Sequence, residues 1–95
     1  MFVETPCIVI DMDKVEHNLK RMDEICKTTG CHLRPHVKTH KIPELAKLQM
    51  QYGANGITVA KLSEAEIMAS YGINDIFMAY PLIGESRIQR AITLS

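Results

Sequence analysis

Basic side chains recur at every second position in residues 33–41, which read Leu-Arg-Pro-His-Val-Lys-Thr-His-Lys. Because side chains alternate across a β-strand, the basic positions would share one face and the positions between them the other. The basic set is Arg34, His36, Lys38 and His40, and the set between them is Pro35, Val37 and Thr39. A buried unpaired charge is strongly unfavourable. The row therefore predicts acids, an anion or a cofactor beside it, at the C-terminal end of a strand.

Lys38 has covalent chemistry available to it that arginine lacks. Desolvation and neighbouring cations favour the neutral amine of a lysine, and a neutral amine attacks an aldehyde to form a Schiff base. The alternative is an ordinary lysine at a strand end whose amine extends to water. Spacing alone leaves both interpretations open.

The cysteine and histidines of this region suggest a different kind of site, a local metal centre. The candidate ligands are Cys31, His32, His36 and His40. Residues four apart on a strand are separated by about 13 Å, whereas imidazole nitrogens bind zinc at about 2.1 Å. A helix would gather them, but Pro35 disfavours one. We therefore predict no metal site from these residues.

Short β-branched runs alternate with amphipathic segments along the chain. The predicted strands are Thr5 to Ile10, His32 to Lys38, Gly56 to Ala60 and Asp75 to Tyr80. Predicted helices begin at Asp13 capped with Glu16, near Pro43, and at Ser63 capped with Glu66. Their predicted ends are Gly30, Gly53 and Gly72. The apolar faces expected in the second, third and last helical segments are Leu45, Leu48 and Tyr52, then Ala65, Met68 and Ala69, then Ile88, Ala91 and Ile92.

This alternation predicts an α/β fold with parallel strands joined by right-handed crossovers. A complete (β/α)8 barrel takes about 250 residues, so the 95 residues would form the N-terminal portion of a TIM barrel. The last strand would then be an open parallel edge, and such edges pair with other chains. We expect a homo-oligomer, a dimer.

The composition limits the partners and the compartment. Eleven Lys and Arg residues balance eleven Asp and Glu residues, which gives no electrostatic footprint for nucleic acid or an anionic membrane. No apolar stretch approaches the roughly 18 residues of a membrane span, so we expect a cytoplasmic protein with a small-molecule substrate. The three cysteines, Cys7, Cys26 and Cys31, are expected to be buried reduced thiols.

Several motifs resemble the opening of D-threonine aldolases and D-serine dehydratases. The most specific is the nine-residue segment 33–41. Further matching positions are Thr5-Pro6, Ile10-Asp11, Asn18, Gly53-Ala54, Glu64-Ala65-Glu66 and Ala79-Tyr80-Pro81. This resemblance covers essentially the whole chain and implies a barrel of the alanine racemase type (fold type III).

The resemblance implies a pyridoxal phosphate (PLP) cofactor that forms an internal aldimine with the lysine at position 38. Lys38 is then the catalytic residue, and Arg34, His36 and His40 are predicted to help bind the cofactor. Residues 1–95 would be the N-terminal portion of the PLP-binding barrel domain. The rest of the barrel, a C-terminal β domain and the ligands of an assisting divalent metal would lie outside them. The implied reactions are retro-aldol cleavage of D-threonine and dehydration of D-serine.

Other functions stay open. An amino-acid racemase of the same fold and a non-catalytic PLP-binding homeostasis protein both hold the cofactor on a strand-end lysine, and a purely structural module is compatible with the residues. Lys61 and Tyr80, which follow the third and fourth predicted strands, are weaker site candidates. A solvated lysine and a tyrosine packed under a loop are the commoner fates of such residues.

Overall fold

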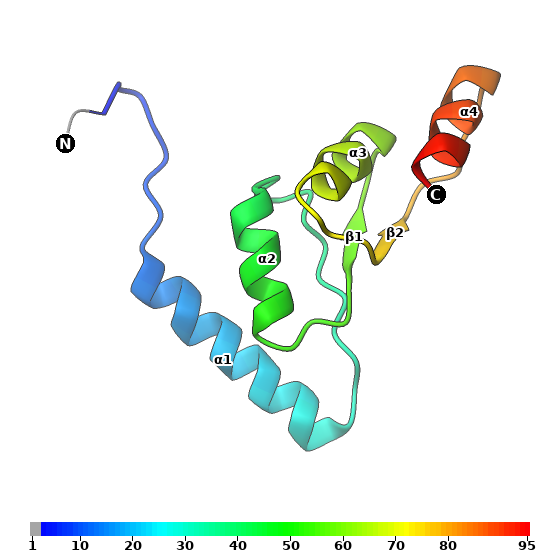
Figure 1. Cartoon of the computed structure of the whole chain (residues 1–95). Coiled ribbons are helices and arrows are strands. Elements are labelled where there is room, and N and C mark those ends of the chain that lie inside the picture. Colours follow the sequence, from blue (N-terminus) through cyan, green and yellow to red (C-terminus); the bar gives the residue numbers. More distant parts are fainter. Residues whose placement is uncertain (1–2) are drawn as a thin grey trace.

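Two helices are followed by two short parallel strands, each with a helix after it, along residues 3–95, the part of the chain that the computed structural model describes (Figure 1). The elements are α1 (Met12–Thr29), α2 (Pro43–Gln51), β1 (Ile57–Val59), α3 (Leu62–Ser70), β2 (Ile76–Met78) and α4 (Glu85–Leu94). β1 and β2 are parallel, with Thr58 opposite Phe77. The α/β fold with parallel strands, predicted as a portion of a barrel, is confirmed.

Residues 33–37 lie along the other side of β1 and extend the sheet. The amide of Thr58 donates to the carbonyl of Pro35 (2.8 Å), and the amide of Val37 donates to the carbonyl of Thr58 (2.9 Å). His36 is the parallel partner of Thr58. The predicted strand from His32 to Lys38 is therefore wrong in its extent. Pro35 has no N–H to donate, and the chain turns away at residues 38–40.

The core lies on the side of the sheet that α2 and α3 cover. Val37, Ile57 and Val59 are fully buried there, against Ala46 of α2 and Met68 of α3. Burying side chains of this size stabilises a fold by about 1.5–3 kcal/mol each. The face predicted for α3 is confirmed at Ala65 and Met68. Ala46 is the buried residue of α2, whereas the predicted Leu45, Leu48 and Tyr52 are only partly buried.

Two predicted helix caps are wrong by a few residues. Asp11, not Asp13, caps α1: its backbone is extended, and its Oδ1 accepts the amides of Asp13 (3.1 Å) and Lys14 (3.3 Å). The box predicted for Ser63 and Glu66 is formed two residues earlier, by Lys61 and Glu64, because α3 begins at Leu62. The stop at Gly30 is confirmed: its φ is 73°, a left-handed conformation that glycine adopts without strain.

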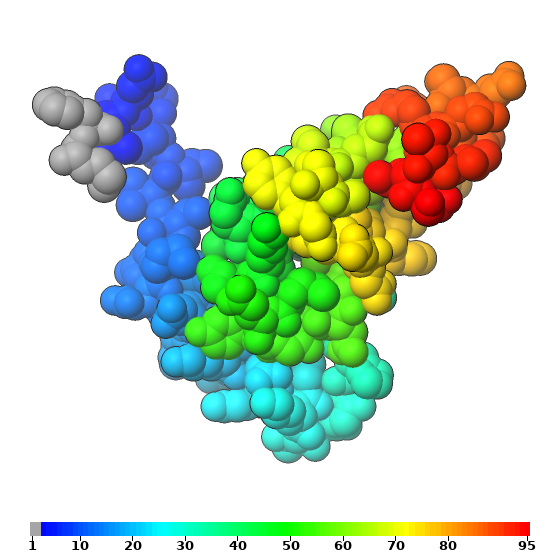
Figure 2. Space-filling view, in the orientation of Figure 1, coloured from blue at the N-terminus to red at the C-terminus, as the bar shows by residue number. Residues whose placement is uncertain are grey.

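Two arms project from the central body in Figure 2, the N-terminal segment in blue and α4 in orange and red. No strand forms at Thr5 to Ile10, since no described residue pairs with it. Ile8 is 93% exposed and Val9 is 82% exposed. α1 and α4 have no buried residues. The face predicted for α4 is partly buried only at Ala91, and Ile88 and Ile92 are exposed.

Candidate active site

We define the inner face as the side of the sheet opposite α2 and α3. Arg34 lies at the end of this face where β1 and β2 begin. Its Nη2 donates to Oδ1 of Asp75 at 2.7 Å, and its Nη1 donates to the carbonyls of Ile57 (3.1 Å) and Asp75 (3.3 Å). The guanidinium therefore joins residues 33–37 to the first residue of β1 and to the residue that precedes β2. The acid predicted to accompany the basic row is Asp75.

Gly56 is buried beneath this guanidinium, and a residue with a larger side chain would not fit at this position. A Cβ there would meet Nη1 of Arg34 and would lie 2.7 Å from the backbone oxygen of Asp75. The glycine thus allows the Arg34 and Asp75 pair to form across β1.

His36 forms the next layer, beside Thr58 and Phe77. Its Nδ1 accepts the backbone N–H of Lys38 at 3.3 Å, so a neutral His36 ring carries its proton on Nε2. The ring is partly buried. This hydrogen bond supports the turn that begins at Lys38.

Lys38 is the first residue of a turn at the C-terminal end of the inner face. The fully buried Val37 anchors the turn, and the amide of Lys41 closes it by donating to the Val37 carbonyl at 2.8 Å. Lys38 is exposed and borders a cavity of about 700 Å³. Side chains with polar or charged ends around this cavity are Lys38, Lys61, Ser63, Tyr80, Arg87 and Arg90.

His40 does not share the face of Lys38, because the turn ends the strand-like alternation. Its Nδ1 accepts the amide of Ile42 at 2.9 Å, and its Nε2 lies 3.1 Å from Oε1 of Gln49 in α2. The prediction of one face for the whole basic row is therefore wrong at His40. The ring links the turn to α2.

The cavity brings together residues that are far apart in the sequence. Lys61 and Tyr80, the weaker candidates, both line it, and so do Arg87 and Arg90 of α4. Arg90 hydrogen-bonds and pairs with Glu66 of α3. This hydrogen bond and the positive charge of Arg90 hold the pKa of Glu66 below its usual value, and the same hydrogen bond and the negative charge of Glu66 raise the pKa of Arg90.

Gly56 and Asp75 were not recognised as site residues from the sequence, although a signal was present. Residues 55–60 read Asn-Gly-Ile-Thr-Val-Ala, and residues 74–79 read Asn-Asp-Ile-Phe-Met-Ala. Aligning these two runs places Gly56 opposite Asp75, which agrees with the observed pairing of Ile57 with Ile76. Because inner-face positions recur every second residue, Arg34 falls in the same layer.

Metal-binding residues do not gather in residues 3–95: no group of three or more His, Cys, Asp or Glu side chains is close enough to hold an ion. The three cysteines are free, as predicted, but not buried. Cys7 and Cys31 are exposed and Cys26 is partly buried, because the segments that carry them lie outside the core.

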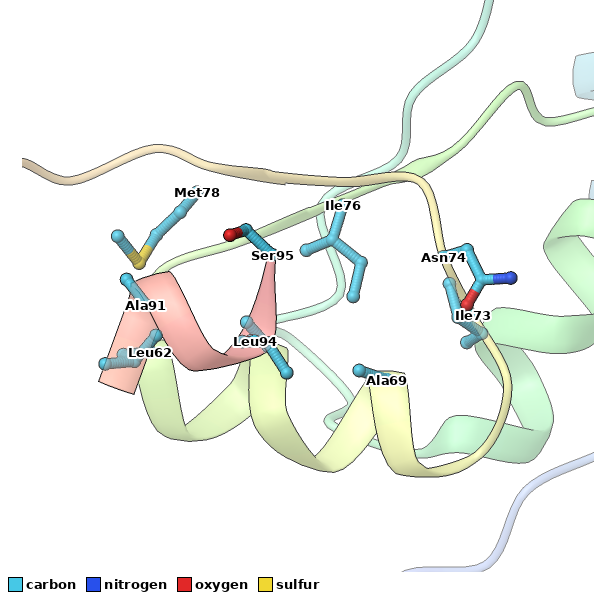
Figure 3. Close-up of a pocket in the computed structure, with 10 residues that line it drawn as sticks. Leu62, Ala69, Ile73, Asn74, Ile76, Met78, Ala91, Leu94 and Ser95 are labelled. Atoms are coloured by element: carbon cyan, nitrogen blue, oxygen red, sulfur yellow. The ribbon is translucent and has the colours of Figure 1, made fainter. Parts of the chain in front are cut away.

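A second, smaller cavity of about 270 Å³ separates α4 from α3 and β2 (Figure 3). Leu62, Ala69, Ile76, Met78 and Leu94 are among the side chains around it, and it has no charged residue. It is an apolar gap beneath α4 and offers no groups for catalysis.

Across residues 3–95, no helix combines the length and the apolar character needed to cross a membrane.

A parallel sheet covered by helices, with polar groups at the carboxyl ends of its strands, is the arrangement of (β/α)8 barrel enzymes. More specifically, residues 10–94 match the family model described as alanine racemase, N-terminal domain, and the chain belongs to that family.

Its relatives include an aldolase and a dehydratase. The chain is 40% identical over 92 residues to D-threo-3-hydroxyaspartate dehydratase of Delftia sp. (strain HT23), covering 97% of this chain and 24% of that protein. It is 38% identical over 86 residues to D-threonine aldolase of Arthrobacter sp, covering 90% and 23%. The crystal structure of D-threonine aldolase from Filomicrobium marinum superposes with a TM-score of 0.93 at 37% identity, covering 97% and 25%. The chain spans about a quarter of the length of these relatives.

Proposed function

We propose that residues 1–95 are the N-terminal portion of the cofactor-binding barrel domain of a PLP-dependent lyase. Its substrates would be D-amino acids with a β-hydroxyl group. The family match and the aldolase and dehydratase relatives support this reaction class. Retro-aldol cleavage and dehydration both begin from such a substrate; we take the aldolase reaction as the first choice and the dehydratase reaction as the alternative.

The position of Lys38 carries the proposal. PLP needs an amine for its aldehyde and cations for its phosphate. Lys38 offers the amine at the border of the 700 Å³ cavity, and Lys61 and Arg87 bring positive charge to the same cavity. The residues present therefore fit both the reactive end and the charge of this cofactor.

PLP, when bound, supplies the electron sink for breaking bonds at the substrate α-carbon. Lys38 would hold the cofactor covalently through its Nζ, and this amine would be released when the amine of the substrate takes its place. Throughout, Val37 and His36 keep the turn at the end of the inner face.

The other predicted cofactor contacts differ in their position relative to Lys38. His36 lies two residues before Lys38 on the inner face, and its Nε2 can donate towards a group bound there. His40 would orient the turn through its bonds to Ile42 and Gln49. Arg34 lies four residues before Lys38 and is held by Asp75, so we propose that it supports the inner face beneath the cofactor. A divalent metal that assists at the substrate hydroxyl would need ligands from outside residues 1–95.

Borohydride trapping tests the role of Lys38. The intact protein is reduced in the presence of PLP and digested, and fragment ions are used to separate Lys38 from Lys41. We expect the pyridoxyl group on Lys38 and its loss in Lys38→Arg, with Lys20→Arg on the exposed side of α1 as the matched control. Label on another lysine in the unsubstituted protein contradicts the proposal.

Product assays then distinguish the reactions. Acetaldehyde from D-threonine identifies an aldolase, and pyruvate from D-serine identifies a dehydratase. Exchange of the α-proton without either product identifies a racemase, and labelling of Lys38 with no turnover identifies a PLP carrier. Activity confined to L-isomers would refute the stereochemical assignment.

A further inference from the structure

Glu64 is a buried carboxylate that the proposed reaction does not use. It is 7% exposed, and its Oε1 accepts the amides of Ala60 (2.8 Å) and Lys61 (3.3 Å) where β1 passes into α3. Its Oε2 is buried and has no hydrogen-bond partner among residues 3–95. Burial of a charged oxygen without a partner is strongly unfavourable, so a cation is expected beside it.

Lys41 provides that cation, with its Nζ 4.0 Å from Oε2 of Glu64. The same Nζ donates to the backbone carbonyl of Lys38 at 2.7 Å. Lys41 therefore connects the buried carboxylate to the residue that we propose holds the cofactor.

The backbone of Lys41 is strained in a way that this connection explains. Its φ is 56°, in the left-handed region, which costs a residue with a Cβ about 1–2 kcal/mol. In this conformation the Lys41 amide closes the turn onto Val37, and the side chain reaches back to Lys38. Glycine would adopt the same backbone without strain but could not make the side-chain contacts.

We propose that Lys41 and Glu64 are positioning residues for Lys38. Glu64 is fixed to the end of β1, the Lys41 ammonium bridges from it to the Lys38 carbonyl, and the turn is thereby held in the shape that presents the Lys38 amine to the cavity. This inference rests on the proposed role of Lys38 and adds the groups that set its orientation.

The decisive variants are Lys41→Gly and Lys41→Met in the intact protein, with Lys20→Met as the matched control. The readouts are the affinity for PLP, the rate at which borohydride traps it on Lys38, and the melting temperature of the cofactor-free protein. We expect trapping to slow and affinity to fall about tenfold or more, the loss of one charge-assisted hydrogen bond. Both variants lose the cation beside Glu64, but Lys41→Gly should melt higher than Lys41→Met, because only glycine relieves the strain at φ 56°. Lys41→Arg, which keeps a cation in place, should recover most of the loss.

Unchanged trapping and affinity in both Lys41→Gly and Lys41→Met would overturn the proposal, as would a loss that Lys41→Arg does not recover. Failure of the proposed function looks different, since the label would then lie elsewhere in the unsubstituted protein. Amide exchange at Lys41 gives a readout that needs no cofactor. It should quicken in Glu64→Gln and stay unchanged in the control Glu44→Gln, whose exposed residue lies in the first turn of α2.

Discussion

The central body and the two arms both contain large apolar side chains, but only the body buries them. In the body, Ile57 and Val59 are fully buried between helices. In the N-terminal arm, Ile8 is 93% exposed, and in α4 Ile92 is 60% exposed. The difference is one of partners, because a β-branched run is stabilised only where neighbouring strands and helices cover it. Lys38 lies on the body, where backbone positions are set by pairing on both sides of β1, whereas Arg87 and Arg90 reach the same cavity from α4.

Removing a core side chain should show the largest difference between body and arm. We expect Ile57→Ala to lower the free energy of unfolding by about 2–5 kcal/mol, because it leaves a cavity among fully buried neighbours. Ile8→Ala, in the exposed arm, should change it by at most about 0.5 kcal/mol. Denaturant unfolding of the two variants measures both values. Equal losses would mean that the arm packs as tightly as the body.

The layer of Arg34, Gly56 and Asp75 tests whether the inner face of the body is as tightly constrained as its core. We expect Gly56→Ala to destabilise the fold by about 1–3 kcal/mol, because the added methyl group displaces the guanidinium and the Asp75 carbonyl. Gly84→Ala is a control for adding a methyl group: its space is open, and its loss should reflect only the positive φ of 100°. A Gly56→Ala variant as stable as the unsubstituted protein would show that the Arg34 and Asp75 pair can move aside.

Sequence patterns predicted the body well because local and tertiary preferences agree there. The alternation in residues 33–37 correctly placed Val37 in the core and Arg34 and His36 on the opposite face. Gly30, which ends α1, was also predicted correctly from the sequence. By contrast, the β-propensity of Thr5 to Ile10 predicted a strand that no described residue pairs with.

The fine structure of the site could not be read from the sequence. The turn after Val37 depends on the left-handed backbone of Lys41, and the presence of a lysine does not predict that conformation. Glu64 and Glu66 are both spaced for a cap, and the choice between them depends on where α3 begins. Once Glu64 takes the cap, Glu66 is free to pair with Arg90, a contact set by how α4 lies on α3.

That contact between Glu66 and Arg90 links an arm to the body and should produce the smallest effect, one that depends on pH. The hydrogen bond from Arg90 lowers the pKa of Glu66 in the folded protein below its ordinary value of 4.5. A carboxyl group with a lowered pKa stabilises the folded state above its unfolded pKa, and this contribution is lost as the pH falls through the lowered value. We therefore expect stability to decline below about pH 4.5 partly through Glu66, and Glu66→Gln to show a shallower decline than the unsubstituted protein. Unfolding measured across this pH range at low and high salt tests this, with Glu16→Gln on the exposed face of α1 as the control. Because both partners are at the surface, high salt should remove the difference. A difference that persists in high salt, or one that appears equally in the control, would show that the pair does not tether α4 in the way that the geometry indicates.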